Sequence, residues 1–228
     1  MAAFENREEA GRLLAEQLKR YAGPDAVVCA LPRGGAPVAA PIAKALGAPL
    51  SILFVKKIAA PAHPEVAIGA IVDGDDPTLV RKDDVIAALN VSELYITTES
   101  DAALGEIERR KRLYEDFNPP IALKDKTVII VDDGLATGAS MEAAIDAAKA
   151  VNAKRVIAAI PVGPSETVAR LREAADELVC LDTPSPFLSV STSYDDFPQL
   201  EDAEVIKILI EAQSPANDER EPSRVAKL

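Results

Sequence analysis

Short apolar runs alternate along the chain with longer segments whose apolar positions recur at helical spacing. The continuous runs over 26–31 and 50–55 have the length of strands, and three more come later, over 127–132, 155–160 and 177–181. Unbroken apolar strands are typical of a parallel sheet that is covered on both faces. Helices are predicted by the spacing of apolar residues over 6–22, from Gly35 to about Leu46, and over 138–150, 165–175 and 202–212. The sequence therefore predicts an α/β fold with a doubly wound parallel sheet.

The middle of the chain interrupts this rhythm. Residues 57–80 contain several prolines and short apolar runs, which predict a β hairpin or a similar excursion. Helical patterns follow over 82–89 and 92–115. We therefore expect a β and helical insertion at about 57–120 within the sheet domain.

No linker or repeat divides the sequence further. We expect a single domain over residues 1–212, followed by a mobile polar tail over 213–228.

Charge and composition narrow the function classes. The net charge of −12 disfavours a protein that grips nucleic acid by its phosphates. With no apolar run long enough for a membrane span or a signal core, we expect a cytoplasmic protein that binds neither membrane nor nucleic acid. The two cysteines, Cys29 and Cys180, lie in apolar runs and are interpreted as buried thiols in a reduced compartment.

The most informative segment is Val128–Ser140, with the sequence Val-Ile-Ile-Val-Asp-Asp-Gly-Leu-Ala-Thr-Gly-Ala-Ser. Its apolar strand delivers Asp132 and Asp133 to the carboxyl edge of the sheet, where ligands bind in open α/β folds. Small residues then lead into a helix, whose N-terminus favours phosphate. The spacing is not that of a Walker loop or of a dinucleotide-binding glycine motif.

This string resembles the phosphoribosyl pyrophosphate motif of type I phosphoribosyltransferases. The resemblance implies a type I phosphoribosyltransferase-like fold in which Asp132 and Asp133 bind the ribose hydroxyls. It also implies that the following loop binds the 5-phosphate through Ala136, Thr137, Gly138, Ala139 and Ser140.

A second string, Leu31-Pro32-Arg33-Gly34-Gly35, matches the place where this family carries its pyrophosphate loop. The resemblance implies a cis peptide between Pro32 and Arg33, with Arg33 on the pyrophosphate and Gly34 and Gly35 in the loop. The family also supplies a basic residue after the second core strand. Lys56 is the candidate for that role, although the residues do not decide between it and Lys57.

The resemblance implies transfer of the 5-phosphoribosyl group from phosphoribosyl pyrophosphate to a nucleobase or amine, with release of pyrophosphate. Asp132, Asp133 and Arg33 are the expected catalytic residues. Mg²⁺ is expected as a cofactor carried on substrate oxygens, without a metal site built by the protein. The alternative is a regulator that senses phosphoribosyl pyrophosphate or a nucleotide without turnover. A homodimer is also possible.

Three features leave the acceptor open. Ala136 stands where one branch of the family has an aspartate, and alanine transfers no proton. A general base could instead come from the segment over 98–120, whose carboxylates are Glu106, Glu108 and Glu115. This segment carries a basic run and is a candidate mobile lid; the alternative is a rigid surface helix. The small hood of the family could lie at 183–198, whose aromatics either stack on a base or anchor the loop: Phe187, Tyr194 and Phe197.

Overall fold

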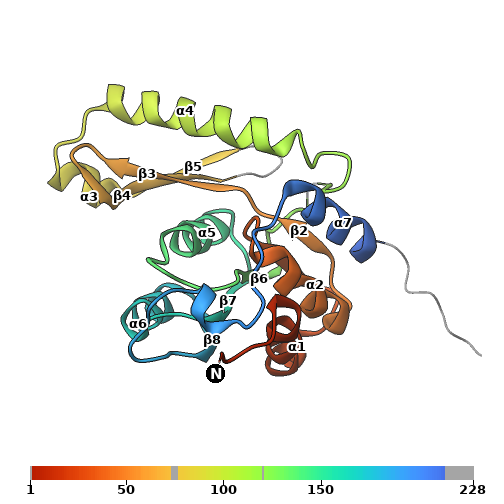
Figure 1. Ribbon diagram of the computed structural model, residues 1–228. Coiled ribbons are helices and arrows are strands. Elements are labelled where there is room, and N and C mark those ends of the chain that lie inside the picture. The colour runs from red at the N-terminus through yellow and green to blue at the C-terminus, as the bar shows by residue number, and fades with distance from the viewer. Residues whose placement is uncertain (1, 73–76, 120, 214–228) are drawn as a thin grey trace, which may run out of the picture.

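The protein is built around a parallel sheet of five strands, in the computed structural model that describes residues 2–72, 77–119 and 121–213. The strand order is β2-β1-β6-β7-β8, and every neighbouring pair is parallel. The strands are β1 (Ala26–Ala30), β2 (Leu50–Ile52), β6 (Thr127–Val131), β7 (Arg155–Val162) and β8 (Glu177–Asp182). All five predicted core strands are thus present, and the predicted doubly wound parallel sheet is confirmed (Figure 1).

Helices cover both faces of this sheet. Side chains alternate along each strand, so that Val28 and Ile129 pack with α1 and α2, whereas Val27 and Val128 pack with α5 and α6. This double burial explains why the strands are apolar at most of their positions. The helices are α1 (Arg7–Leu18), α2 (Gly35–Leu46), α5 (Ala139–Ala150), α6 (Ser165–Ala174) and α7 (Asp202–Gln213), and short 3-10 turns lie at η1 (Lys19–Tyr21) and η2 (Ser191–Ser193).

The interruption seen in the sequence folds as a separate antiparallel sheet with two helices. Its strand order is β3-β4-β5, and it lies between α4 and α5 (Figure 1). On one face, Ile58 and Ile68 join the same buried cluster as Ile96 and Ile107 of α4. The elements are β3 (Val55–Ala60), β4 (His63–Val72), β5 (Thr78–Arg81), α3 (Asp83–Ala88) and α4 (Glu93–Lys111).

One predicted strand needs correction. The apolar run over 50–55 is not one strand, because β2 ends at Ile52 and β3 of the other sheet begins at Val55. Leu53 and Phe54 between them are buried, so the chain changes sheets without leaving the core. Because the apolar run is unbroken, the sequence did not show where the chain passes from one sheet to the other.

The segment over 98–120, predicted as a mobile lid or a surface helix, is mostly helical. The 19-residue helix α4 occupies most of this segment and buries Ala103 and Ile107. After it, Tyr114 is fully buried, with its ring 5.5 Å from that of Phe54. The described part of the segment is therefore anchored by buried contacts, and its movement as a lid stays a prediction.

Asn118 completes this anchor at the free edge of the parallel sheet. Its side-chain Oδ1 accepts a hydrogen bond from the Ile52 N–H (2.7 Å), and its Nδ2 donates to the Ile52 carbonyl (3.1 Å). Both polar groups of one edge residue are thus satisfied by a single buried side chain.

The N-terminal segment packs against the segment that contains Tyr194. Phe4 forms an isolated β-bridge with Tyr194, and the two rings lie 5.4 Å apart. Of the predicted tail, Gln213 ends α7 and residues 214–228 lie outside the described residues. Within the described chain, no helix is both long and apolar enough to cross a membrane.

Candidate functional site

Two loops meet at the carboxyl edge of the parallel sheet. One follows β1 and contains residues 31–35; the other follows β6 and contains residues 132–138. They are in direct contact, because the Leu31 N–H donates to the Val131 carbonyl at 2.9 Å. The two strings singled out in the sequence are therefore neighbours in space.

The loop over residues 136–140 enters α5 through Gly138, whose φ of 74° lies in the left-handed region that glycine favours. A side chain there would also collide, since its Cβ would come within 2.7 Å of Thr167 Cγ2. Gly138 is therefore required both by backbone conformation and by the closeness of α6. It places the N-terminus of α5 at the sheet edge, as predicted.

Helix α6 fixes the shape of this loop from behind. Arg170 donates from Nη2 to the Thr137 carbonyl (2.6 Å), and Thr167 donates to the Ala136 carbonyl (3.3 Å). Both loop carbonyls therefore point towards α6. Ala136, Thr137 and Ser140 themselves remain exposed and are accessible to a ligand.

Asp132 and Asp133 lie side by side and are only partly exposed. The Asp133 N–H donates to Asp132 Oδ1 at 2.9 Å, which fixes the first carboxylate over the turn. Burial raises the pKa of Asp132 well above its usual range, and the negative charge of Asp133 adds to this. Burial also raises the pKa of Asp133, although the Arg7 guanidinium opposes the shift. This pair is an electron-rich acceptor for hydroxyl groups.

The loop after β1 approaches these carboxylates closely. A Cβ on Gly34 would come 2.1 Å from Asp133 Oδ2, and one on Gly35 would come 2.4 Å from the Val131 carbonyl oxygen. The two glycines are therefore needed for close approach. The peptide between Pro32 and Arg33 is cis, as the family resemblance implied.

Arg33 projects from this loop towards the start of α7. Its Nη1 lies 3.9 Å from Asp202 and 4.0 Å from Glu201. Asp202 also accepts a hydrogen bond of 2.5 Å from the buried Tyr114 hydroxyl. The guanidinium remains about one-third exposed, so an anion could still reach it.

Lys56 and Lys57 lie in β3 of the antiparallel sheet and not at the end of a core strand. They point to opposite faces, as neighbours in a strand do. Lys56 forms an ion pair with Glu106 of α4 (2.8 Å), whereas Lys57 lines a cavity beside the 136–140 loop. The structure therefore places Lys57 closer to the candidate chemistry than Lys56.

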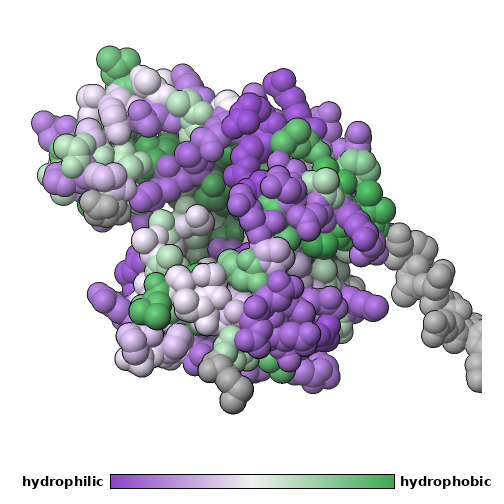
Figure 2. Space-filling model, in the orientation of Figure 1, coloured by the Kyte–Doolittle hydropathy of each residue, from purple (hydrophilic) through white to green (hydrophobic). Residues whose placement is uncertain are grey.

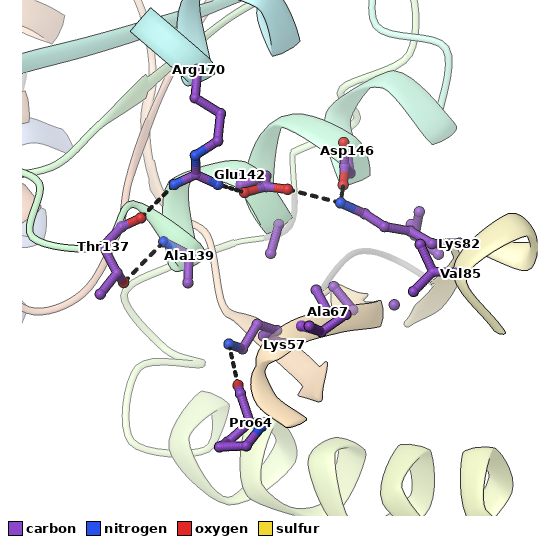
Figure 3. A pocket seen from close by; sticks show the side chains of 15 residues that line it. Lys57, Pro64, Ala67, Lys82, Val85, Thr137, Ala139, Glu142, Asp146 and Arg170 are labelled. Atoms are coloured by element: carbon purple, nitrogen blue, oxygen red, sulfur yellow. Dashed lines mark hydrogen bonds and ion pairs between the residues drawn. The ribbon is translucent and has the colours of Figure 1, made fainter. Parts of the chain in front are cut away.

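That cavity has a volume of about 490 Å³ and lies between the antiparallel sheet and α5 (Figure 3). Figure 2 shows the surface hollowed between the antiparallel sheet and the body below it. Thr137 and Ala139 contribute one end of the wall. Glu142 binds Arg170 and also Lys82 (2.9 Å), so a chain of ion pairs runs across the cavity to the antiparallel sheet. Lys82 also pairs with Asp146 (3.1 Å), so two cations and two carboxylates alternate along this chain.

The remaining candidates from the sequence are Glu106 of α4 and the aromatic residues of the hood candidate over 183–198. The pKa of Glu106 is lowered by its hydrogen bond to Lys56, which makes it a poor proton acceptor. Tyr194 of the hood candidate is buried and donates its hydroxyl to the Asp133 carbonyl at 2.6 Å. Its ring packs against Phe197 with the ring centres 4.9 Å apart, so these aromatics anchor their own segment beside the acid pair. A role of 183–198 as acceptor hood stays a prediction.

The cysteine thiols take no part in this arrangement: Cys29 is buried as expected, whereas Cys180 is only partly buried. Burial raises the pKa of Cys29 to about 12 and that of Cys180 to about 11, so both are thiols at neutral pH. Arg7 was not singled out in the sequence, although it contacts Asp133 directly. The one local signal was a cation in the first turn of a helix, where the helix dipole favours acidic residues.

Known proteins share both the sequence and the fold. Residues 2–196 match the family model described as phosphoribosyl transferase domain. Two Mycobacterium tuberculosis proteins, from strains CDC 1551 and H37Rv and provisionally named phosphoribosyl transferases, are each 42% identical over 209 residues, or 92% of this chain. The chain spans about half (47%) of the length of these curated relatives.

A solved structure covers nearly the same extent. The crystal structure of the protein TT1426 from Thermus thermophilus is 38% identical and superimposes with a TM-score of 0.83, over 92% of this chain and 99% of that one. Together with the family match, these similarities lead to one conclusion: the chain belongs to the phosphoribosyl transferase domain family.

Proposed function

We propose that this protein transfers the 5-phosphoribosyl group from phosphoribosyl pyrophosphate to a nucleobase or amine acceptor, with release of pyrophosphate. The observation that carries the proposal is that three structural features lie together at the carboxyl edge of the parallel sheet. These are the acid pair Asp132 and Asp133, the 136–140 loop at the start of α5, and the glycine loop that bears Arg33. Membership in the family supports the same assignment.

Each feature suits one part of the donor substrate. The backbone N–H groups at the start of α5 suit the 5-phosphate, because a helix N-terminus attracts anions. The carboxylates suit the ribose hydroxyls, which donate hydrogen bonds. Arg33 suits the pyrophosphate, whose oxygens a guanidinium can bind in pairs.

The reaction forms a bond between the acceptor nitrogen and the anomeric carbon. The bond from that carbon to the pyrophosphate oxygen breaks, and pyrophosphate leaves with the electron pair. The acceptor nitrogen passes its proton to a base. Positive charge develops on the ribose as the bond breaks, and the carboxylates of Asp132 and Asp133 stabilise it electrostatically. Arg33 balances the charge of the leaving group.

Mg²⁺ is proposed as a cofactor that arrives with the substrate. Among the described residues, no group of three or more His, Cys, Asp or Glu side chains is placed to hold a metal ion. The paired carboxylate oxygens of Asp132 and Asp133 fit an ion that prefers oxygen ligands and keeps much of its water. When bound, Mg²⁺ would neutralise charge on the pyrophosphate.

The test is to screen purines, pyrimidines and simple amines with phosphoribosyl pyrophosphate and Mg²⁺ while measuring pyrophosphate release. The matched control is the double variant Asp132→Asn, Asp133→Asn, which should keep its fold and lose turnover. Tight binding of phosphoribosyl pyrophosphate without release in any mixture would instead favour a sensor, a role for which Ala136 leaves room. If calorimetry detects no binding of phosphoribosyl pyrophosphate, both functions are refuted.

A further inference from the structure

Arg7 is a buried cation beside the acid pair, and neither motif contains it. Among the described residues, the buried polar side chains are those of Arg7, Ser51, Asn118 and Ser193, and Arg7 alone of these is charged. A guanidinium that is only 8% exposed must be compensated by partners, because burying an unpaired charge is costly. Its partners therefore show what it does.

Three contacts hold the guanidinium in place. Nε donates to Asp133 Oδ2 (2.8 Å), and Nη1 donates to the Pro198 carbonyl (2.8 Å). The ring of Phe197 lies beneath it, 3.6 Å from the guanidinium carbon to the ring centre. Such stacking suits the planar group of arginine and is lost in lysine. Arg7 is thus clamped by the segment after Tyr194 and presents one N–H to Asp133.

Asp133 is therefore held from two directions. Arg7 binds its Oδ2 from α1, and Gly34 packs so closely that a Cβ there would come 2.1 Å from the same oxygen. The carboxylate cannot rotate freely between these neighbours. The contact joins the start of α1, the segment near Phe197 and the loop of Arg33 at a single carboxylate.

Arg7 also supplies the counter-charge for the pair. The charged and titratable groups that face Asp133 are Asp132 from the same turn, Arg7 from α1 and the Tyr194 hydroxyl; Arg33 in the adjoining loop turns towards Asp202. Arg7 is the cation that opposes the effect of burial on both carboxylates. Without it, both would retain their protons at higher pH.

We propose that Arg7 is a positioning residue, which orients the Asp133 carboxylate and neutralises the acid pair so that the pair can bind the ribose hydroxyls of a phosphoribosyl substrate. The inference rests on the proposed function. It adds a residue of the first helix to a site otherwise formed by the loops after β1 and β6. Arg7 acts through Asp133 and needs no contact with the substrate.

The experiment compares Arg7→Met with Arg12→Met, a matched control on the exposed side of the same helix, where Arg12 pairs with Glu8. Calorimetry measures the binding of two probes, ribose 5-phosphate and inorganic phosphate, at about pH 8 and about pH 5.5. Ribose 5-phosphate uses the acid pair and the 136–140 loop, whereas inorganic phosphate uses the loop alone.

Arg7→Met should weaken ribose 5-phosphate binding by roughly tenfold, more at the lower pH, and should change inorganic phosphate binding by less than about twofold. Arg12→Met should change neither. Arg7→Lys, which keeps the charge without the stacked plane, should show an intermediate loss and remains the test if Arg7→Met fails to fold. Equal loss of both probes would show a merely structural role and overturn the inference.

The two proposals fail in different ways. If the unmodified protein binds ribose 5-phosphate and the Arg7 variants bind it equally well, the inference is wrong and the proposed function stands. If the unmodified protein binds neither ribose 5-phosphate nor phosphoribosyl pyrophosphate, the proposed function is wrong and takes the inference with it.

Discussion

Substituting Gly138 by alanine is the sharpest test of how the 136–140 loop is built. The left-handed conformation at Gly138 costs a non-glycine residue roughly 1–2 kcal/mol. The new Cβ would also lie 2.7 Å from Thr167 Cγ2 and 3.0 Å from Leu171 Cδ1, and overpacking of this kind costs about 1–3 kcal/mol. We therefore expect Gly138→Ala to lower the free energy of unfolding by about 2–5 kcal/mol.

Gly47 provides a control that separates the two costs. It also has a positive φ, 61°, but a Cβ there would meet nothing within 4 Å. Gly47→Ala should therefore lose only the conformational part, roughly 1–2 kcal/mol. Urea denaturation of both variants measures the difference, and calorimetry with ribose 5-phosphate should show weakened binding for Gly138→Ala alone.

A second substitution tests the contact between a Cβ at position 138 and Thr167 Cγ2. Thr167→Ser removes the Cγ2 atom and keeps the hydroxyl that donates to the Ala136 carbonyl. In the Gly138→Ala background it should recover about 1 kcal/mol of stability. The reasoning is refuted if Gly47→Ala and Gly138→Ala lose the same free energy, or if Gly138→Ala binds ribose 5-phosphate as the unmodified protein does.

Three further predictions concern charged residues. Because the folded-state pKa of Asp132 is raised, ionisation of this carboxyl destabilises the fold as pH rises. Asp132→Asn should therefore increase the free energy of unfolding at neutral pH, and the gain should vanish towards about pH 4. A loss of stability at neutral pH would contradict this prediction. Arg170→Met removes the hydrogen bond to the Thr137 carbonyl and should weaken phosphate binding by roughly tenfold, whereas Arg172→Met on the exposed side of α6 should not, as measured by calorimetry. Lys57→Met should weaken phosphoribosyl pyrophosphate binding. Lys56→Met should leave that binding unchanged and cost less than about 1 kcal/mol of stability. If Lys56→Met instead weakens binding more than Lys57→Met does, Lys56 is restored as the candidate.

The parts of the site that are local in sequence could be predicted from it. Asp132 to Ser140 form one continuous strand end, turn and helix start, so their arrangement follows from short-range geometry. The glycine loop with its cis peptide is equally local. Its cis peptide was expected only through the family resemblance, and its contact with Asp133 was not predicted.

The rest depends on contacts between distant residues. Arg7 reaches Asp133 across 126 positions and Tyr194 reaches it across 61, and no spacing pattern reports such pairs. The lysine pair was misplaced because the apolar run before it continues through Leu53 and Phe54 from one sheet into the other. The sequence left the anchoring of the 98–120 segment open because its charged residues are consecutive, whereas the buried residues of α4 are widely spaced.

Asn118 has a consequence for how copies of this protein behave together. The outer strand of an open sheet exposes unpaired N–H and carbonyl groups, and these can recruit a strand from another molecule. The Asn118 amide occupies both groups of Ile52 and so stands in for one residue of a sixth strand. At this edge, protection of Ile52 against pairing with another molecule thus depends on a single carboxamide that lies in neither of the loops forming the candidate site.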